Sequence, residues 1–223
     1  MRFTDFYAAA NTCSPSRAAL MTGRYPPRSG VNAVLFHDTP EGLPKSEVTI
    51  PALLRAAGYH TAMIGKWHLG ATDEFMPLSY GFDEFFGVPH SNDEKNFFVY
   101  DGRQRLPETV DQSQLIRRYT DRALAYLDRA AQGGTPFFLY LAYNAPHVPL
   151  YPSPAFTGHS RRGTYGDVVE EPDASVGEVL ARLAALGLER DTLVIFASDN
   201  GPWLAMRDWG GSAGGLRGGK TST

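Results

Sequence analysis

Short apolar runs along the chain predict four strands. Each run is brief, rich in aromatic or β-branched residues, and bounded by turn-forming residues, which is the pattern of a strand. The predicted strands cover residues 2–8, 59–64, 136–143 and 192–198. The third run is apolar without alternation and follows a Gly-Gly break, so we expect it to be buried on both faces of a sheet.

Helical patterns fill the intervals between these strands. The predicted helices cover residues 14–23, 49–58, 114–133 and 167–186. Ser14 and Thr49 are candidate N-caps, and Gly23 suits the left-handed position that ends a helix. Pro172 lies inside the last helix and should kink or restart it. The aromatic run at 82–87 is interpreted as core packing under a long loop.

The resulting order is β-α-β-α-β-α-β. It favours an α/β fold, with a mostly parallel sheet, helices on both faces and right-handed crossovers. No linker or internal repeat divides residues 1–223, so we interpret them as part of one domain.

Polar clusters fall near the carboxyl ends of all four predicted strands. They contain Cys13, Lys66 with His68, His147, and Asp199 with Asn200. Open α/β sheets bind ligands along that edge, so the four clusters are predicted to converge on one crevice. Each cluster alone also has a structural explanation; Asp199-Asn200-Gly201, for example, is a good turn sequence.

Composition narrows the classes of partner. The net charge is −3 and the pI is about 6.1, which gives no reason to expect nucleic acid as a partner. No run of about 18 apolar residues occurs, so no membrane segment is expected. With one cysteine, the chain can form no internal disulfide, and cysteine usage does not identify the redox compartment.

That cysteine, Cys13, is predicted to lie just ahead of a short helix. Free backbone N–H groups and the helix dipole favour an anion there, and Arg17 adds a full positive charge. A free cysteine is more often a small buried hydrophobic residue than a nucleophile. Position alone therefore does not decide whether Cys13 is a nucleophile or a buried hydrophobic residue.

Longer motifs identify a family. The string C-S-P-S-R-A-A-L-M-T-G-R at 13–24 resembles the signature of the sulfatase family. Four later segments resemble that family's motifs in the same order: G-K-W-H-L-G at 65–70, A-P-H-V-P at 145–149, S-D-N-G at 198–201 and G-K-T at 219–221. The arylsulfatase A-like branch is the most similar. The resemblance implies an alkaline phosphatase/sulfatase-like core that hydrolyses sulfate esters.

The resemblance also implies that Cys13 is a precursor. In the family, a formylglycine-generating maturation enzyme oxidises this cysteine to an aldehyde, and the hydrate of that aldehyde is the nucleophile. The hydrate has two hydroxyl groups, so one can attack sulfur and the other can then lose its proton to release sulfate. Arg17 matches the arginine that steadies the hydrate. His68 matches the histidine beside the hydrate, and His147 matches the one near the leaving-group oxygen.

The remaining roles concern sulfate and metal. Lys66, Lys220 and Ser91 match residues that contact sulfate in the family. Asp199 and Asn200 match ligands of a divalent metal, to which position 13 would add the hydrate oxygen. These roles make chemical sense, because attack on a sulfate monoester requires its negative charge to be neutralised. Hard oxygen ligands suit Ca²⁺, with Mg²⁺ as the alternative.

Parts of the family pattern lie outside residues 1–223. Its paired aspartates, on a strand before the signature, would precede Met1, and its C-terminal region would follow Thr223. We therefore expect a partial, incomplete catalytic domain that is inactive alone, since Ca²⁺ prefers about six to eight oxygen ligands. The resemblance implies export to the periplasm, the exterior or the lysosome, although residues 1–223 show no signal peptide.

Other functions fit parts of the pattern. A phosphonate or phosphate ester hydrolase of the same superfamily can share the cysteine signature. A non-catalytic remnant that binds sulfated glycans would keep the cationic residues without turnover. An enzyme that uses the Cys13 thiol directly would be inactivated by iodoacetamide. The individual sulfate ester and the oligomeric state are left open.

Overall fold

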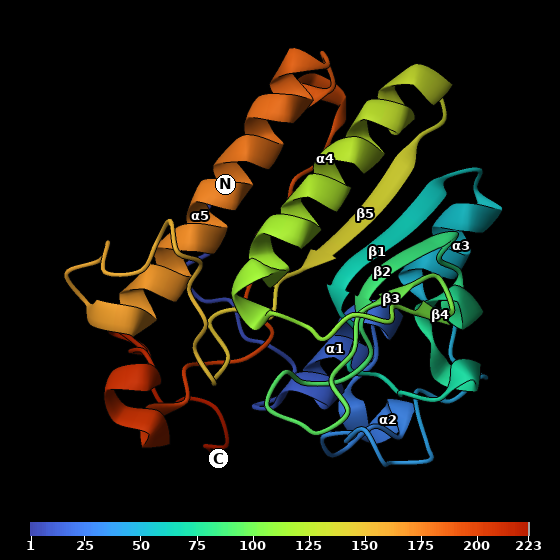
Figure 1. The fold of residues 1–223 in the computed structure, drawn as a ribbon. Coiled ribbons are helices and arrows are strands. Elements are labelled where there is room, and N and C mark those ends of the chain that lie inside the picture. Colours follow the sequence, from blue (N-terminus) through green and yellow to red (C-terminus); the bar gives the residue numbers. More distant parts are fainter. Residues whose placement is uncertain (223) are drawn as a thin grey trace.

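The structure, a computed structural model, describes residues 1–222 (Figure 1). Its helices are α1 (Cys13–Thr22), α2 (Pro26–Ser29), α3 (Ile50–Ala56), α4 (Leu115–Gly133) and α5 (Gly163–Ala185). Its strands are β1 (His60–Lys66), β2 (Glu84–Val88), β3 (Tyr100–Asp101), β4 (Gln104–Arg105) and β5 (Phe137–Ala142). Five 3-10 turns complete the regular structure: 73–75, 77–80, 112–114, 189–191 and 204–209.

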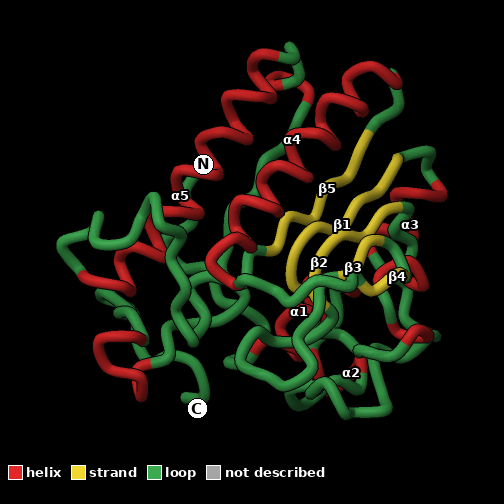
Figure 2. The backbone as a smooth tube through the Cα atoms, viewed as in Figure 1, coloured by secondary structure: helices red, strands yellow, loops and turns green. Residues whose placement is uncertain are grey.

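One five-stranded sheet organises these elements, in the order β4-β3-β2-β1-β5. Strand β1 pairs in parallel with both β2 and β5, and Ile64 lies opposite Phe86 on one side and Leu141 on the other. The short strands β3 and β4 add an antiparallel edge. The three parallel strands therefore end together, and Figure 2 shows loops gathered at that end.

Helices cover both faces of the sheet, and alternation along β1 explains how. Met63 packs on one face against Ala18 and Met21 of α1. Its neighbour Ile64 points to the opposite face, where α4 contributes Tyr119 and Ala123. Helix α5 packs against α4, with Leu183 near Leu127 (Figure 1). The expected α/β class, with a mostly parallel sheet and helices on both faces, is confirmed.

Several local signals act as expected. Thr49 caps α3 by accepting a hydrogen bond from the N–H of Ala52. Gly23 ends α1 in the left-handed region, at φ 66°. Helix α4 follows its predicted range closely because its apolar positions keep a helical period over 19 residues. Strand β5 forms as predicted but is only half buried, because it is the edge strand of the sheet.

Two of the predicted strands are not strands. Residues 2–8 and 192–198 form no sheet ladder, and their apolar side chains are exposed; Ile195, for example, is 78% exposed. Both segments have strand-forming residues, but neither is paired with a strand of the sheet. The prediction was wrong because a strand is stabilised by its neighbours and not by its composition alone.

The opposite error concerns β2. The aromatic run at 82–87, interpreted from the sequence as packing under a loop, contains most of a central strand. Phe85 and Phe86 fill opposite faces of the sheet, which makes the run apolar without making it a loop. Pro172 likewise does not restart its helix, because α5 is continuous from Gly163 to Ala185. Its packing along α4 holds both halves in one helix.

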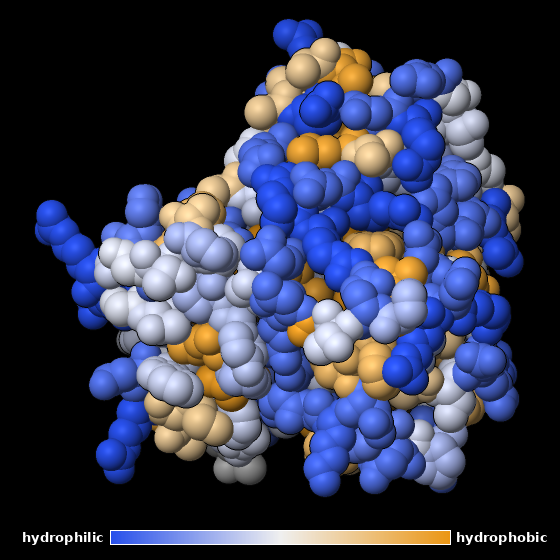
Figure 3. Space-filling model, in the orientation of Figure 1, coloured by the Kyte–Doolittle hydropathy of each residue, from blue (hydrophilic) through white to orange (hydrophobic). Residues whose placement is uncertain are grey.

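Most of the molecular face in Figure 3 is hydrophilic, with small apolar patches between charged side chains. Helix α4 carries charged residues, including Arg117, which pairs with Asp121 and Glu178. Among residues 1–222, no helix combines the length and apolarity needed to cross a membrane.

The difference between β1 and residues 192–198 is measurable by hydrogen exchange. Ile64 and Ile195 have the same side chain, but only Ile64 lies in a strand paired on both sides. We expect the amide of Ile195 to exchange about a thousandfold faster than that of Ile64, because its exchange needs no unfolding of the sheet. Comparable protection at the two isoleucines, read by amide exchange NMR, would contradict this description of residues 192–198.

Candidate active site

Helix α1 begins at Cys13 itself, and not after it as expected. The N-cap is Thr12, whose side chain makes no capping hydrogen bond. Ser14, the predicted cap, is inside the helix, and its hydroxyl instead accepts a hydrogen bond from the N–H of Leu35 at 3.0 Å. Cys13 is 3% exposed and is a free thiol in the first helical turn. Its position keeps it at the positive end of the α1 dipole.

Arg17, one turn further along α1, connects three parts of the molecule. Its Nε and a terminal nitrogen each lie 2.9 Å from the same oxygen, Oδ2 of Asp199. Its other terminal nitrogen donates to the backbone carbonyl of Lys66 at 2.6 Å, where β1 ends. The same nitrogen lies 3.4 Å from the hydroxyl of Tyr140 on β5. Arg17 thus holds Asp199 against the carboxyl ends of both strands.

Lys66 brings a second positive charge to Cys13. Its Nζ lies 3.9 Å from Sγ of Cys13 and donates to Oγ of Ser91 at 3.0 Å. Lys66 and Ser91 are 1% and 4% exposed. Burial disfavours the ammonium and lowers the pKa of Lys66 to about 8. At neutral pH the group is still mostly charged.

Asp199 and Asn200 offer oxygen atoms beside Arg17. Although burial opposes ionisation, the charges of Arg17 and Lys66 lower the pKa of Asp199, so its carboxylate is ionised. The hydroxyl of Ser16 donates to the Asp199 carbonyl, which fixes the backbone there. Asn200 uses its amide nitrogen to bond the Gly201 carbonyl at 2.9 Å. Its Oδ1 is buried and has no hydrogen-bond partner among the described residues.

His68 lies two residues beyond the end of β1 in an unusual backbone conformation. Its φ is 63°, a left-handed value that costs a residue other than glycine about 1–2 kcal/mol. Its N–H donates to the carbonyl of Pro89 at 2.9 Å, which fixes the turn. The ring is buried, and neither of its nitrogens has a hydrogen-bond partner within residues 1–222. Burial and the charge of Lys66 lower the pKa of His68 to about 3, so the ring is neutral.

His147 and Lys220 form a second group. Nδ1 of His147 lies 2.6 Å from the carbonyl of Val148, which can only accept a hydrogen bond, so Nδ1 carries the proton. Nε2 then accepts from Nζ of Lys220 at 2.7 Å. Burial and the charges of Lys66 and Lys220 lower the pKa of His147 to about 4. Lys220 also lies over the ring of Trp203, 4.4 Å from its centroid.

The structure therefore brings the predicted residues to one end of the sheet in two groups. Direct contacts link the residues of the first group, Cys13, Arg17, Lys66, Ser91 and Asp199. His147 and Lys220 form the second, and no hydrogen bond joins the two groups within residues 1–222. His68 lies two residues after Lys66, and Asn200 directly follows Asp199. The two ring nitrogens of His68 and Oδ1 of Asn200 form no hydrogen bond with side chains of the first group.

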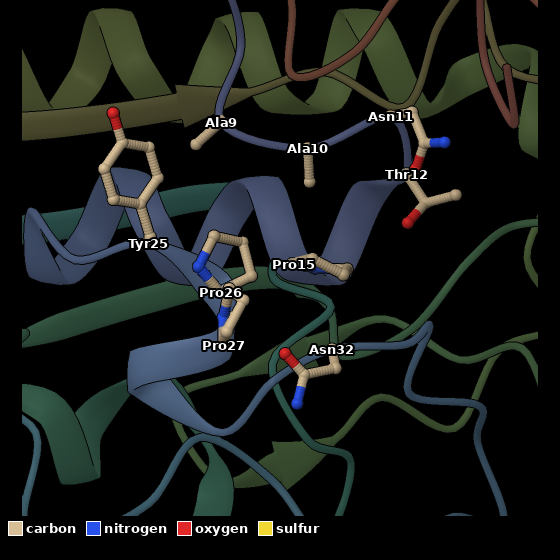
Figure 4. Close-up of a pocket in the computed structure, with 9 residues that line it drawn as sticks. All are labelled: Ala9, Ala10, Asn11, Thr12, Pro15, Tyr25, Pro26, Pro27 and Asn32. Carbon is tan, nitrogen blue, oxygen red and sulfur yellow. The ribbon is translucent and has the colours of Figure 1, made fainter. Parts of the chain in front are cut away.

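A hollow of about 330 Å³ in the described part of the chain is not formed by these residues. Figure 4 shows its lining, which comes from the segment before α1, the first turn of α1 and the chain around α2, and includes Asn11, Thr12, Pro15, Tyr25 and Asn32. None of these side chains carries a charge, so the hollow offers no counter-charge for a sulfate group. Within residues 1–222, no cluster of three or more His, Cys, Asp or Glu side chains has the arrangement of a metal site.

Two residues near the site were missed in the sequence. Glu94, 9% exposed at its side chain, lies 3.6 Å from Nε2 of His68 and accepts the N–H of Ser91 at 3.0 Å. Tyr140 reaches Arg17 from β5. The polar run from His90 to Glu94 directly after β2 could have indicated the first of these, had β2 been recognised as a strand. Nothing in the sequence distinguishes Tyr140 from its aromatic neighbours.

Arg17 supplies a stability prediction. Replacing it in Arg17→Leu would remove the partner of Asp199 and the donor to Lys66, and we expect a loss of about 3 kcal/mol in the free energy of unfolding. Arg24→Leu is the matched control, because Arg24 is half exposed and its ion pair with Glu47 is expected to contribute about 1 kcal/mol or less. Urea unfolding followed by fluorescence measures both. Equal losses in the two variants would rule out a special role for the Arg17–Asp199 pair.

Comparisons with known proteins agree with the arrangement. A model of the family described as Sulfatase matches residues 1–223. The N-acetylgalactosamine-6-sulfatase of Mus musculus is 42% identical, covering 100% of this chain and 48% of the relative, and the arylsulfatase A of Bos taurus is 39% identical, covering 100% and 49%. The crystal structure of Ps i-CgsB superposes with a TM-score of 0.86 at 32% identity, covering 97% of this chain and 53% of that one. The chain spans about half the length of the curated relatives it matches, and it belongs to the sulfatase family.

Proposed function

We propose that the protein is a sulfuric ester hydrolase that cleaves sulfate monoesters at the site around Cys13. The observation that carries this proposal is the contact between Cys13 and the buried ammonium of Lys66, with Arg17 one helical turn away. A sulfate ester brings negative charge, and fixed cations that replace its water shell stabilise the charge that develops during attack. The proposed catalytic residues are Cys13, Arg17, His68 and His147.

Position 13 suits formylglycine. The side chain is small, lies at the start of α1 and faces a cation, so an oxygen nucleophile formed there would be stabilised by Lys66 and the helix dipole. Formylglycine, made by a formylglycine-generating enzyme, would supply a hydrated aldehyde with two hydroxyl groups. Arg17 would support that position from the same helix while its own charge is balanced by Asp199.

The residues present also fit a hard metal ion. Asn200 presents a buried Oδ1 with no hydrogen-bond partner in the described chain, directly after the ionised Asp199. A buried oxygen left unsatisfied costs free energy unless a ligand completes it. Asp199 and Asn200, with the oxygen at position 13, would hold Ca²⁺ or alternatively Mg²⁺. The ion would act as a Lewis acid that stabilises negative charge on oxygen.

Three side chains are proposed to hold the sulfate group. Lys66 and Ser91 already contact each other, and both are buried, so they can present a donor pair without further ordering. Lys220 lies at the other side of the site, where its ammonium is fixed between His147 and the ring of Trp203. Neither lysine forms an ion pair with a carboxylate within residues 1–222, so both ammonium groups can neutralise the negative charge of a sulfate ester.

His68 and His147 are proposed to move protons. His68 is neutral and buried, so at neutral pH its proposed role is that of a general base and not of a general acid. His147 donates through Nδ1 to Val148 and receives a hydrogen bond from Lys220 at Nε2. A proton for the leaving alcohol is therefore available from the His147–Lys220 pair, and not from His147 alone.

The substrate is proposed at the level of its class. The names of the relatives suggest N-acetylgalactosamine 6-sulfate and aryl sulfates as the first esters to test. Export, to the periplasm, the exterior or the lysosome, remains a proposal drawn from the family. A non-catalytic role in binding sulfated glycans is the alternative, in which the cationic residues would bind sulfate without turnover.

Formylglycine formation tests the proposed function. We expect the chain, co-expressed with a formylglycine-generating enzyme, to carry the aldehyde at Cys13, seen as the corresponding mass change in the peptide containing residues 13–17. Cys13→Ala is the control, and it should show no aldehyde-reactive group. A thiol that stays unmodified while a known sulfatase matures in the same cells would favour binding without catalysis. Inactivation by iodoacetamide would instead indicate a thiol enzyme.

The metal site gives a second test. Two protein oxygen side chains fall short of the six to eight oxygen ligands that Ca²⁺ takes, so we expect the matured 223-residue chain to bind Ca²⁺ weakly and to be inactive on nitrophenyl and nitrocatechol sulfate. Titration calorimetry and an absorbance assay measure the two. Clear turnover of the sulfate esters would overturn the expected inactivity, and faster turnover of an aryl phosphonate ester would favour the phosphonate hydrolase.

A further inference from the structure

Glu94 occupies a central place that no motif of the chain indicates. It lies on the segment between β2 and β3, and its side chain is 9% exposed. One oxygen, Oε1, lies 3.6 Å from Nε2 of His68 and accepts the N–H of Ser91 at 3.0 Å. A single carboxylate therefore faces two of the residues proposed to act on the sulfate ester.

The other oxygen anchors a different loop. Oε2 accepts the backbone N–H of His37 at 2.6 Å and lies 3.2 Å from Nδ1 of the same ring. His90 does not take over the carboxylate, because its own nitrogens lie 3.1 Å from the carbonyls of Ser91 and Asn96. No Lys or Arg forms an ion pair with Glu94 within residues 1–222. Its negative charge thus faces His68 through Oε1 and His37 through Oε2, with no Lys or Arg of the described chain in ion-pair range.

This geometry decides between the two neutral forms of the His68 ring. A neutral imidazole carries its proton on one nitrogen and a lone pair on the other. A lone pair on Nε2 would face the carboxylate of Glu94 and be repelled, whereas an N–H there would be attracted. The separation of 3.6 Å exceeds an ordinary hydrogen bond, but a charge in a buried setting acts over that distance. No other acceptor competes for either ring nitrogen in the described chain.

We propose that Glu94 is a positioning residue that keeps the proton of neutral His68 on Nε2 and so leaves Nδ1 as the free base. By holding the N–H of Ser91, the same carboxylate also fixes the hydroxyl that contacts Lys66. The catalytic consequence rests on the function proposed above: His68 can accept a proton at Nδ1 only if the tautomer is set beforehand. The tautomer itself is a property of the folded chain and does not depend on turnover.

Nitrogen NMR of the intact chain tests this assignment. At pH 7.5 the ring of His68 is neutral, and the ¹⁵N shifts of its two nitrogens report which one is protonated. We expect a single Nε2–H form in the unaltered chain, identified by its loss in His68→Gln. In Glu94→Gln the carboxylate charge is gone, and the shift difference between the two nitrogens of His68 should shrink as both tautomers become populated. Glu94→Asp should restore the single form.

Glu108→Gln is the matched control. It makes the same chemical change at an exposed carboxylate that pairs with Arg118, and the His68 shifts should not move. An Nδ1–H form of His68 in the unaltered chain would overturn the proposal, whatever the variants do. An unchanged Nε2–H form in folded Glu94→Gln would also overturn it. Failure of formylglycine formation at Cys13 would count against the proposed function and would leave this measurement unaffected.

Discussion

The buried ammonium of Lys66 is the constraint around which the site is arranged. It is 1% exposed, and in the described chain its side-chain contacts are a hydroxyl and a thiol, with no carboxylate in ion-pair range. An unpaired charge in the interior is costly, and the lowered pKa of Lys66 reflects that cost. Asp199 could have neutralised it, but Arg17 holds that carboxylate with two nitrogens. The positive charge of Lys66, beside Cys13, is therefore available to an anionic ligand.

Only two of the four strands that were expected to carry the site residues are present in the structure. Lys66 is the last residue of β1, His68 lies two residues beyond it, and His147 follows β5, as the convergence argument requires. Asp199 follows an extended segment that belongs to no sheet, and it is brought into place by Ser16 and Arg17 instead. Residues near both ends of the chain are joined in the same way, since the N–H of Thr221 donates to the carbonyl of Asn11. Polar contacts thus replace strand pairing on this side of the molecule.

Much of this arrangement could be read from the sequence, and the remainder could not for physical reasons. The helical period of α4, the cap at Thr49 and the motif around Cys13 are local signals, so they were predictable. Strand β2 has five residues and includes a glycine, so its identity depends on pairing with β1. Residues 192–198 have the composition of a strand, but they pair with no strand of the sheet. Glu94 contacts His68 and His37, which lie 26 and 57 positions away in sequence, and no local pattern reveals such contacts.

The pair between Arg17 and Asp199 also sets an order of events. Its partners are 182 positions apart in sequence, and closing a loop of that length costs about 5 kcal/mol of chain entropy. The contacts of β1 with β2, and of α1 with α2, close much shorter loops and can form before that cost is met. From loop entropy we therefore expect the sheet and its covering helices to form first, and the charged centre to close onto this scaffold later in folding.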